Sequence, residues 1–157
     1  MKKAIKDTDK LSHMTCAIGN ILIHTGLRAV DIAGIKLKNI DWDNEKIYIK
    51  QSKTSQPLEL PLVPIVGNSI YLYLVNERPK VDSEYLFIRG KGKYQQINTS
   101  TVRNHVSKIM DEAKIRLNKN DRRGTHIFRH KLATSMLEKN IPAPIISDIL
   151  GHTSPKK

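Results

Sequence analysis

One short segment, Thr125-His126-Ile127-Phe128-Arg129-His130, combines a group that can transfer a proton with a permanent cation. If this segment opens a helix, His126 and Arg129 lie three residues apart and share one face. A histidine beside an arginine suits the handling of an anionic oxygen, such as that of a phosphate. Short His-x-x-Arg matches also arise by chance, so the interpretation depends on what the rest of the chain supplies.

Two further segments carry side chains that suit an anion. Arg28 and Asp31 lie three residues apart in a short predicted helix, so the carboxylate could hold the guanidinium in one orientation. The alternative is a surface ion pair, which contributes only about 0–1 kcal/mol. Lys53 lies in a polar turn between two predicted strands, where a lysine is most often simply solvated.

A basic segment rich in glycine, Arg89-Gly90-Lys91-Gly92-Lys93, resembles a nucleotide phosphate loop only superficially. It lacks the strand–loop–helix context with a terminal Lys-Ser/Thr pair, so we reject a nucleotide site. We predict instead that Arg89, Lys91 and Lys93 contact backbone phosphates. Arg103, in a later predicted helix, is a further candidate, although solvation alone explains it equally well.

The elements that must position these groups follow from periodicity. Apolar residues at helical spacing predict helices over residues 8–24, 27–35, 64–78, 99–117, 125–140 and 145–150. Thr8 or Asp9 is the expected cap of the first helix, and Gly26 its expected end. Alternating residues predict strands over 40–42, 46–50 and 58–62, and the buried run 85–88 is a further candidate strand. Pro61 should lie at a strand end or at a sheet edge. We therefore expect an α+β fold, mainly helical, with a small antiparallel three-stranded sheet.

The composition limits what this fold can act on. The 157 residues include 27 Lys+Arg against 15 Asp+Glu, a formal net charge of +12. Such a surplus favours DNA, RNA or an anionic membrane surface as partner, and the alternative is a basic protein that is merely well solvated. The single cysteine, Cys16, allows no internal disulfide, which fits a reducing compartment. No apolar run approaches the roughly 20 residues of a membrane span, and no signal peptide is visible, so we expect a cytoplasmic protein.

Taken in order, these segments resemble a known family. Thr25-Gly26-Leu27-Arg28, then Lys53 in a hairpin, His126-x-x-Arg129, and finally Leu150-Gly151-His152 are similar to the motifs of the tyrosine recombinases, the phage integrase family. The resemblance covers essentially the whole chain. It implies one catalytic domain over residues 1–157, which acts on double-stranded DNA, as a tetramer in the full-length protein, and needs neither a metal ion nor another cofactor.

The resemblance also implies a role for each candidate residue. In this family a tyrosine hydroxyl attacks a DNA phosphodiester, which forms a 3′-phosphotyrosyl link and releases a 5′-hydroxyl. Arg28 and Arg129 would bind the non-bridging oxygens, and Lys53 would protonate the leaving 5′-oxygen. His126 would take the proton of the nucleophile or bind a phosphate oxygen, His152 would donate a hydrogen bond to the phosphate, and Asp31 would orient Arg28.

The sequence departs from the family pattern in one respect. The nucleophilic tyrosine is expected shortly after Leu150-Gly151-His152, and no tyrosine follows that box here. The tyrosines are Tyr48, Tyr71, Tyr73, Tyr85 and Tyr94, for which we expect packing and surface roles. We therefore expect a catalytic domain that lacks the tyrosine segment and the N-terminal core-binding domain, and that binds DNA without cleaving it alone.

Three alternatives remain open on the sequence. A helix-turn-helix regulator explains the charge but not the ordered Arg28, Lys53, His126 and Arg129. A type IB topoisomerase would use similar chemistry to relax supercoils. A metal hydrolase could use His126, His130 and His152, but Ile127 stands where a zincin requires its glutamate.

Overall fold

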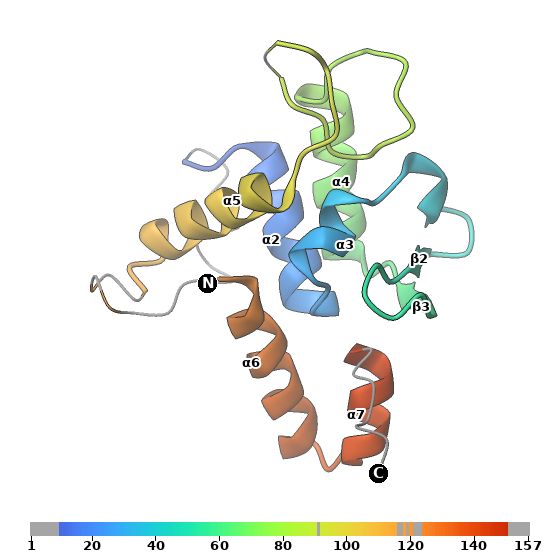
Figure 1. Ribbon diagram of the computed structural model, residues 1–157, viewed down its shortest axis with the longest axis vertical. Coiled ribbons are helices and arrows are strands. Elements are labelled where there is room, and N and C mark those ends of the chain that lie inside the picture. The colour runs from blue at the N-terminus through green and yellow to red at the C-terminus, as the bar shows by residue number, and fades with distance from the viewer. Residues whose placement is uncertain (1–9, 91, 116–117, 119, 121–123, 151–157) are drawn as a thin grey trace.

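The computed structural model describes residues 10–90, 92–115, 118, 120 and 124–150 (Figure 1). Within these ranges, the chain forms the helices α2 (His13–Thr25), α3 (Ala29–Ala33), α4 (Pro64–Asn76), α5 (Thr99–Glu112), α6 (Thr125–Glu138) and α7 (Ala143–Leu150). A 3-10 turn, η1 (Leu37–Asn39), precedes the strands β1 (Ile40–Asp41), β2 (Lys46–Lys50) and β3 (Pro57–Pro61). The strands pair antiparallel in the order β1-β2-β3. The predicted fold class is confirmed.

Helix α2 is the centre of the core and packs against α4, α5 and α6. Ala17, Ile18, Ile21 and Leu22 are fully buried, and apolar residues on more than one face of a helix are typical of a core helix. The side chain of Ser12 caps α2, because its Oγ accepts a hydrogen bond from the Thr15 N–H at 3.2 Å. The predicted start at residue 8 is therefore wrong: residues 10–12 are not helical, and Thr8 and Asp9 lie outside the described residues.

The turn after α2 sets the direction of the next segment. Gly26 closes the helix in the left-handed conformation (φ 62°), and its N–H donates to the Leu22 carbonyl at 3.0 Å, as predicted. Arg28 has an extended backbone and is the N-cap of α3 rather than a helical residue. The predicted helix over 27–35 is thus shortened to Ala29–Ala33.

The sheet matches its prediction to within one residue at each end. Ile47 pairs with Leu60, and both side chains are buried. Pro61 is the last residue of β3, which lies at the edge of the sheet as expected for a residue without an N–H. Strand β1 ends at Asp41, whose carboxylate accepts the Asn44 N–H at 2.9 Å and so begins the turn one residue early.

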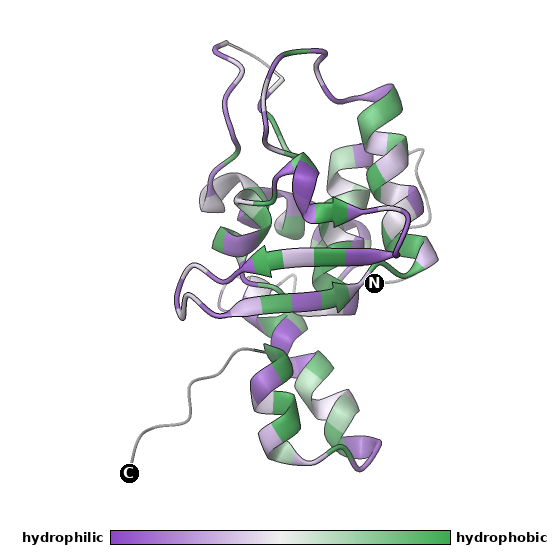
Figure 2. Cartoon of the chain, turned by 90° about the vertical axis from the view of Figure 1, so that its right-hand side faces the viewer, coloured by the Kyte–Doolittle hydropathy of each residue, from purple (hydrophilic) through white to green (hydrophobic). Residues whose placement is uncertain are grey.

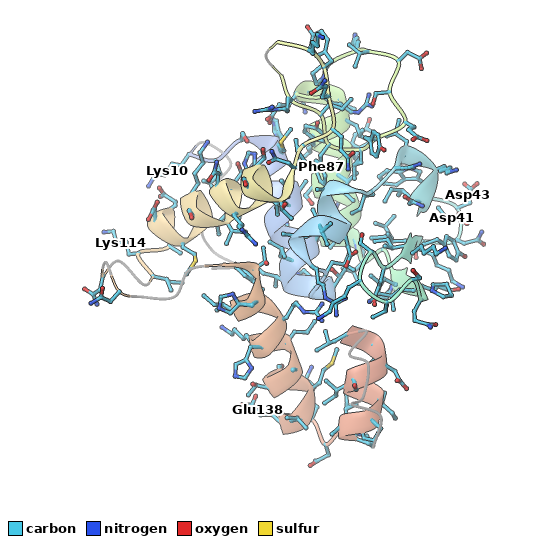
Figure 3. The ribbon with its side chains drawn as sticks, viewed as in Figure 1. Lys10, Asp41, Asp43, Phe87, Lys114 and Glu138 are labelled. Atoms are coloured by element: carbon cyan, nitrogen blue, oxygen red, sulfur yellow. The ribbon has the colours of Figure 1, made fainter. Side chains whose placement is uncertain are left out.

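The apolar run 85–88 is buried as expected, but it is not a strand. Leu86, Phe87 and Ile88 are fully buried, and Figure 3 shows Phe87 in the interior, whereas Lys10, Lys114 and Glu138 lie at the periphery. Among the residues that the structure describes, the run forms two isolated bridges, Lys36 with Tyr85 and Ile88 with Gln96. The guanidinium of Arg78 donates to the carbonyls of Ser83, Tyr85 and Leu86. Main-chain bonds to Ile35 and Ile97 supplement this arginine without forming a continuous ladder.

The remaining helix boundaries differ from prediction by a few residues. Helices α4, α5 and α6 end at Asn76, Glu112 and Glu138, before the predicted residues 78, 117 and 140. Helix α7 begins two residues early, at Ala143, because a proline such as Pro144 is tolerated in the first turn of a helix. None of the described helices is both long and apolar enough to cross a lipid bilayer.

Helices α6 and α7 lie side by side and form one end of the molecule in both views (Figures 1 and 2). The long connection between α4 and α5 forms the opposite end. Phe128 is the buried anchor of α6, while Leu132 and Met136 are half-buried. The α6–α7 pair therefore reaches the core through α2 and the Gly26 turn.

Candidate functional site

The turn at Gly26 is where α2, α6 and α7 meet. The guanidinium of Arg129, on α6, donates from Nη1 to the Gly26 carbonyl at 2.6 Å and from Nη2 to the Leu150 carbonyl at 2.7 Å. A methyl group at Gly26 would stand only 3.0 Å from side-chain carbons of both Leu132 and Leu150. The absence of a side chain at position 26 thus allows Arg129 to join the two segments.

Arg28 and Arg129 come from distant segments of the chain, yet the charge of Arg28 acts on Arg129. Burial lowers the pKa of Arg129, the positive charge of Arg28 lowers that pKa further, and the carboxylate of Asp31 raises it. A guanidinium remains charged at neutral pH even so. Because each of these two cations disfavours the charge of the other, an anion placed between them would be stabilised.

Asp31 is buried beside Arg28. Its Oδ2 lies 3.9 Å from Nη1 of Arg28, and the side chain of Asp31 is fully inaccessible. The pair is therefore not the solvated surface pair that the sequence left open. A buried carboxylate close to one edge of a guanidinium is well suited to hold it in a fixed orientation.

Lys53 lies in the turn between β2 and β3, as predicted, and is exposed. The turn is attached to the Arg28 region, because the Ser52 N–H donates to Oδ1 of Asp31 at 2.8 Å. One carboxylate therefore contacts both the arginine and the residue next to the lysine. In the described part of the chain, the Lys53 ammonium has no hydrogen bond or ion pair, so it can move toward a ligand.

His126 is exposed in the first turn of α6, one helical turn before Arg129. His130 is exposed one residue after Arg129. His152, the third histidine of the metal-site alternative, lies outside the described residues. Within the described ranges, no three His, Cys, Asp or Glu side chains gather as a metal ion requires.

The other predicted DNA contacts lie elsewhere. Arg89 and Lys93 are exposed residues of the connection between α4 and α5. That connection forms the end of the molecule opposite α6 and α7 (Figures 1 and 2). Arg103 is exposed on α5, and Lys91 lies outside the described residues. The structure does not bring Arg89 or Lys93 to the cluster formed by Arg28 and Arg129.

Sequence reasoning missed Gln51. Its side chain is only 2% exposed, and its Oε1 accepts a hydrogen bond from the Thr54 hydroxyl at 2.8 Å and faces Nη1 of Arg28 at 3.5 Å. A signal was present, because Gln51 continues the inward positions Ile47 and Ile49 of β2 with a polar residue.

The five tyrosines have the packing and surface positions that were expected. Tyr73 is buried, and its hydroxyl accepts the Ile88 N–H at 3.2 Å. The ring of Tyr85 lies under the Lys36 ammonium, 5.5 Å from nitrogen to ring centroid. Tyr48, Tyr71 and Tyr94 are exposed on β2, on α4 and in the α4–α5 connection.

Known proteins resemble this chain in both sequence and fold. The sequence profile of the phage integrase family matches residues 1–157. The protein y4gC of Sinorhizobium fredii, named as an integrase/recombinase, is 36% identical over 138 residues, which cover 88% of this chain and 70% of y4gC. A crystal structure of XerA recombinase superimposes with a TM-score of 0.79 at 23% identity, over 98% of this chain and 54% of XerA. XerH recombinase bound to its difH substrate gives a TM-score of 0.76 at 22% identity, over 98% of this chain and 45% of XerH.

A mainly helical domain with a small three-stranded antiparallel sheet is the fold that this chain shares with these recombinases. The chain belongs to the phage integrase family. It spans about half the length of the XerA and XerH chains that it matches.

Proposed function

We propose that this chain provides the phosphate-binding and proton-donating part of an enzyme that cuts and rejoins double-stranded DNA at specific sites. The observation that supports the proposal best is the cluster at Gly26, where Arg129 donates to the Gly26 carbonyl two residues before Arg28. Asp31 connects Arg28 to the turn that carries Lys53. Two forked cations match the geometry of phosphate oxygens, and the lysine is a proton donor on a neighbouring turn.

In the proposed reaction, Arg28 and Arg129 bind the non-bridging oxygens of the scissile phosphate. A tyrosine hydroxyl attacks phosphorus and loses its proton to His126, while the bond from phosphorus to the 5′-oxygen breaks. Lys53 transfers a proton to that 5′-oxygen, and His152 donates a hydrogen bond to the phosphate. Each preorganised donor is worth roughly 3–4 kcal/mol at the transition state. Because the bond energy is kept in the 3′-phosphotyrosyl link, a second 5′-hydroxyl can reverse the step on another strand.

The nucleophile in this proposal is none of the five tyrosines described above. Tyr73 and Tyr85 are engaged in packing, and the other three lie on elements other than α6 and α7. We further propose that the active assembly is the tetramer on DNA that the family resemblance implies. The net charge of +12 supports a polyanionic partner.

The test uses the protein expressed with whatever its gene encodes on either side of residues 1–157. It is incubated with nicked duplex DNA that carries the recombination site of its own element, and a protein–DNA adduct that survives denaturant is measured. We expect Arg129→Ala to reduce adduct formation by about 10²–10³-fold while DNA binding persists. Lys131→Ala, which alters an exposed cation two residues further along α6, is the matched control and should leave both unchanged.

Other outcomes identify the alternatives. DNA binding without any adduct would support a regulator that does not cut DNA. An adduct accompanied by efficient relaxation of a supercoiled plasmid without the recombination site would support a topoisomerase.

A further inference from the structure

Gln51 is an amide placed where the pattern of β2 calls for an apolar side chain. Ile47, Ile49 and Gln51 occupy successive inward positions, and Gln51 is buried between the exposed residues Lys50 and Ser52. A buried polar side chain is costly unless it is hydrogen-bonded, so its partners indicate why it is there.

Those partners link Arg28 to the turn that carries Lys53. Oε1 of Gln51 accepts from the Thr54 hydroxyl at 2.8 Å and faces Nη1 of Arg28 at 3.5 Å. Asp31 connects the same two regions, because Oδ2 faces Nη1 of Arg28 and Oδ1 accepts the Ser52 N–H. Ser52 and Thr54, on the two sides of Lys53, are therefore hydrogen-bonded to Asp31 and Gln51, the two side chains that face Arg28. Lys53 itself is exposed.

Resting on the function proposed above, we infer that Gln51 is a positioning residue, whose amide couples the guanidinium of Arg28 to the turn that presents Lys53 to the leaving oxygen. The amide holds the turn in a fixed position relative to Arg28 before any phosphate is bound. A phosphate that binds to Arg28 therefore finds the proton donor already placed beside it.

The neutral amide suits this role better than a carboxylate. Arg28, Arg129 and Asp31 together leave one net positive charge for the phosphate. A second carboxylate at position 51 would cancel that charge, although it would keep an acceptor in the same place. Gln51→Glu should therefore weaken DNA binding, whereas Gln51→Met, which keeps the volume but removes the acceptor, should not.

The first measurement needs no catalysis. In the free 157-residue chain, we expect backbone amide order parameters near 0.85 for residues 52–55, and a fall below about 0.6 in Gln51→Met. The main-chain bonds from Gln51 N–H to the Gln56 carbonyl and from Ser55 N–H to the Gln51 carbonyl remain in both proteins. Gln56→Met, which changes an exposed glutamine of the same turn, is the control and should leave the order parameters unchanged.

The second measurement reports on the proton donor. It uses the adduct assay described above, with two substrates that differ only in the 5′-bridging atom, oxygen or sulfur. A thiolate, whose conjugate acid has a pKa near 8.5, leaves without a proton, so a sulfur substrate does not need Lys53. We expect Gln51→Met to slow the oxygen substrate by about 10²-fold, as misplacement of a catalytic group does, and to leave the sulfur substrate near the rate of the unaltered protein.

Lys53→Ala separates failure of this inference from failure of the proposed function. If Lys53→Ala also shows the selective loss with oxygen but Gln51→Met does not, the lysine is the acid and the inference about Gln51 is wrong. If Lys53→Ala slows both substrates equally, the proposed function itself is wrong.

Thr54→Val removes the other partner of the Gln51 amide and should give a weaker form of the Gln51→Met result. This second variant keeps the test decisive if Gln51→Met does not fold. A rigid turn at residues 52–55 in Gln51→Met, or a mobile turn in the unaltered chain, would contradict the inference that Gln51 couples this turn to Arg28.

Discussion

At the scale of the residue, Arg129 combines two tasks that the sequence motif does not distinguish. Its guanidinium donates to the carbonyls of Gly26 and Leu150, so it holds α6, α7 and the α2 turn together as well as facing Arg28. Hydrogen bonds to a charged group contribute about 1.5–3 kcal/mol. A loss of activity in an Arg129 variant therefore reports on stability too.

This gives a prediction for Arg129→Lys, which keeps the charge but loses the fork. A single ammonium on a flexible stem cannot reproduce both bonds in the same geometry, so we expect a loss of about 1.5–3 kcal/mol in the free energy of unfolding. Urea unfolding of the 157-residue chain measures it. Lys131→Ala should change that free energy by no more than about 0.5 kcal/mol. An unchanged stability in Arg129→Lys would show that the two carbonyls do not need the arginine.

At the scale of the element, Gly26 sets how closely α6 and α7 approach α2. An alanine there would adopt a left-handed backbone, which costs about 1–2 kcal/mol, and its methyl group would crowd Leu132 and Leu150. We therefore expect Gly26→Ala to lower the free energy of unfolding by at least that amount, measured by urea unfolding. Gly67→Ala is the control, because position 67 is helical, its nearest neighbour is at 3.5 Å, and the change should be neutral or gain up to about 1 kcal/mol. Equal effects at the two positions would contradict this account.

The contact between α2 and α5 gives a prediction on pH. The Thr15 hydroxyl and Nδ1 of His105 are hydrogen-bonded at 2.7 Å, and burial lowers the pKa of His105, as does the charge of Lys108, while Glu77 opposes them. The unfolded chain then takes up a proton at a higher pH than the folded chain does. Stability should be complete above pH about 6.5 and fall as the pH drops below it, by at most about 1.4 kcal/mol per pH unit from this group, until the folded-state pKa is passed.

Urea unfolding between pH 8 and pH 5 measures this dependence. His105→Asn, which cannot titrate, should show a shallower loss than the unaltered chain. Identical pH profiles would mean that His105 titrates alike in the folded and unfolded states.

The helices and strands also show which features of the fold could be predicted from the sequence. The alternation of β2 predicted both ends of that strand, and the period of α5 predicted the start of that helix, because each pattern reflects local burial. The end of α5 was predicted five residues too late. The run 85–88 was assigned wrongly, because the Arg78 side chain binds the Tyr85 and Leu86 carbonyls, and a side-chain partner of this kind leaves no trace in a local sequence pattern. The roles of Arg28 and Arg129 came from resemblance to a family, and the contact of Arg129 with Gly26 could not be predicted, since spacing does not tell which turns meet. Gln51 was missed because a glutamine beside a turn looks solvated until Thr54 and Arg28 are seen around it.

At the scale of the whole molecule, the net charge of +12 is spread well beyond the Arg28–Arg129 cluster. Arg89 and Lys93 are exposed residues of the α4–α5 connection, and this connection forms the end of the molecule opposite α6 and α7. If DNA covers both regions, six to ten cations would contact phosphates, and affinity should fall by about 10³–10⁵-fold between 50 and 200 mM salt. Fluorescence anisotropy of a labelled duplex at several salt concentrations measures this affinity. An affinity that does not change with salt would contradict the proposal that the chain binds nucleic acid.

The slope of that salt dependence gives the number of phosphate contacts, and variants of each region show how many contacts that region makes. Each phosphate contact adds about 0.9 to the slope of log affinity against log salt, so Arg89→Ala with Lys93→Ala should reduce it by about two. Lys46→Ala is the matched control, because Glu59 already forms an ion pair with Lys46 and that lysine should release few counterions. A slope that stays the same in the double variant, while Arg28→Ala reduces it, would confine the DNA to the end of the molecule that carries Gly26, α6 and α7. The connection between α4 and α5 would then face solvent or a neighbouring subunit, and its charges would act only as part of the long-range field.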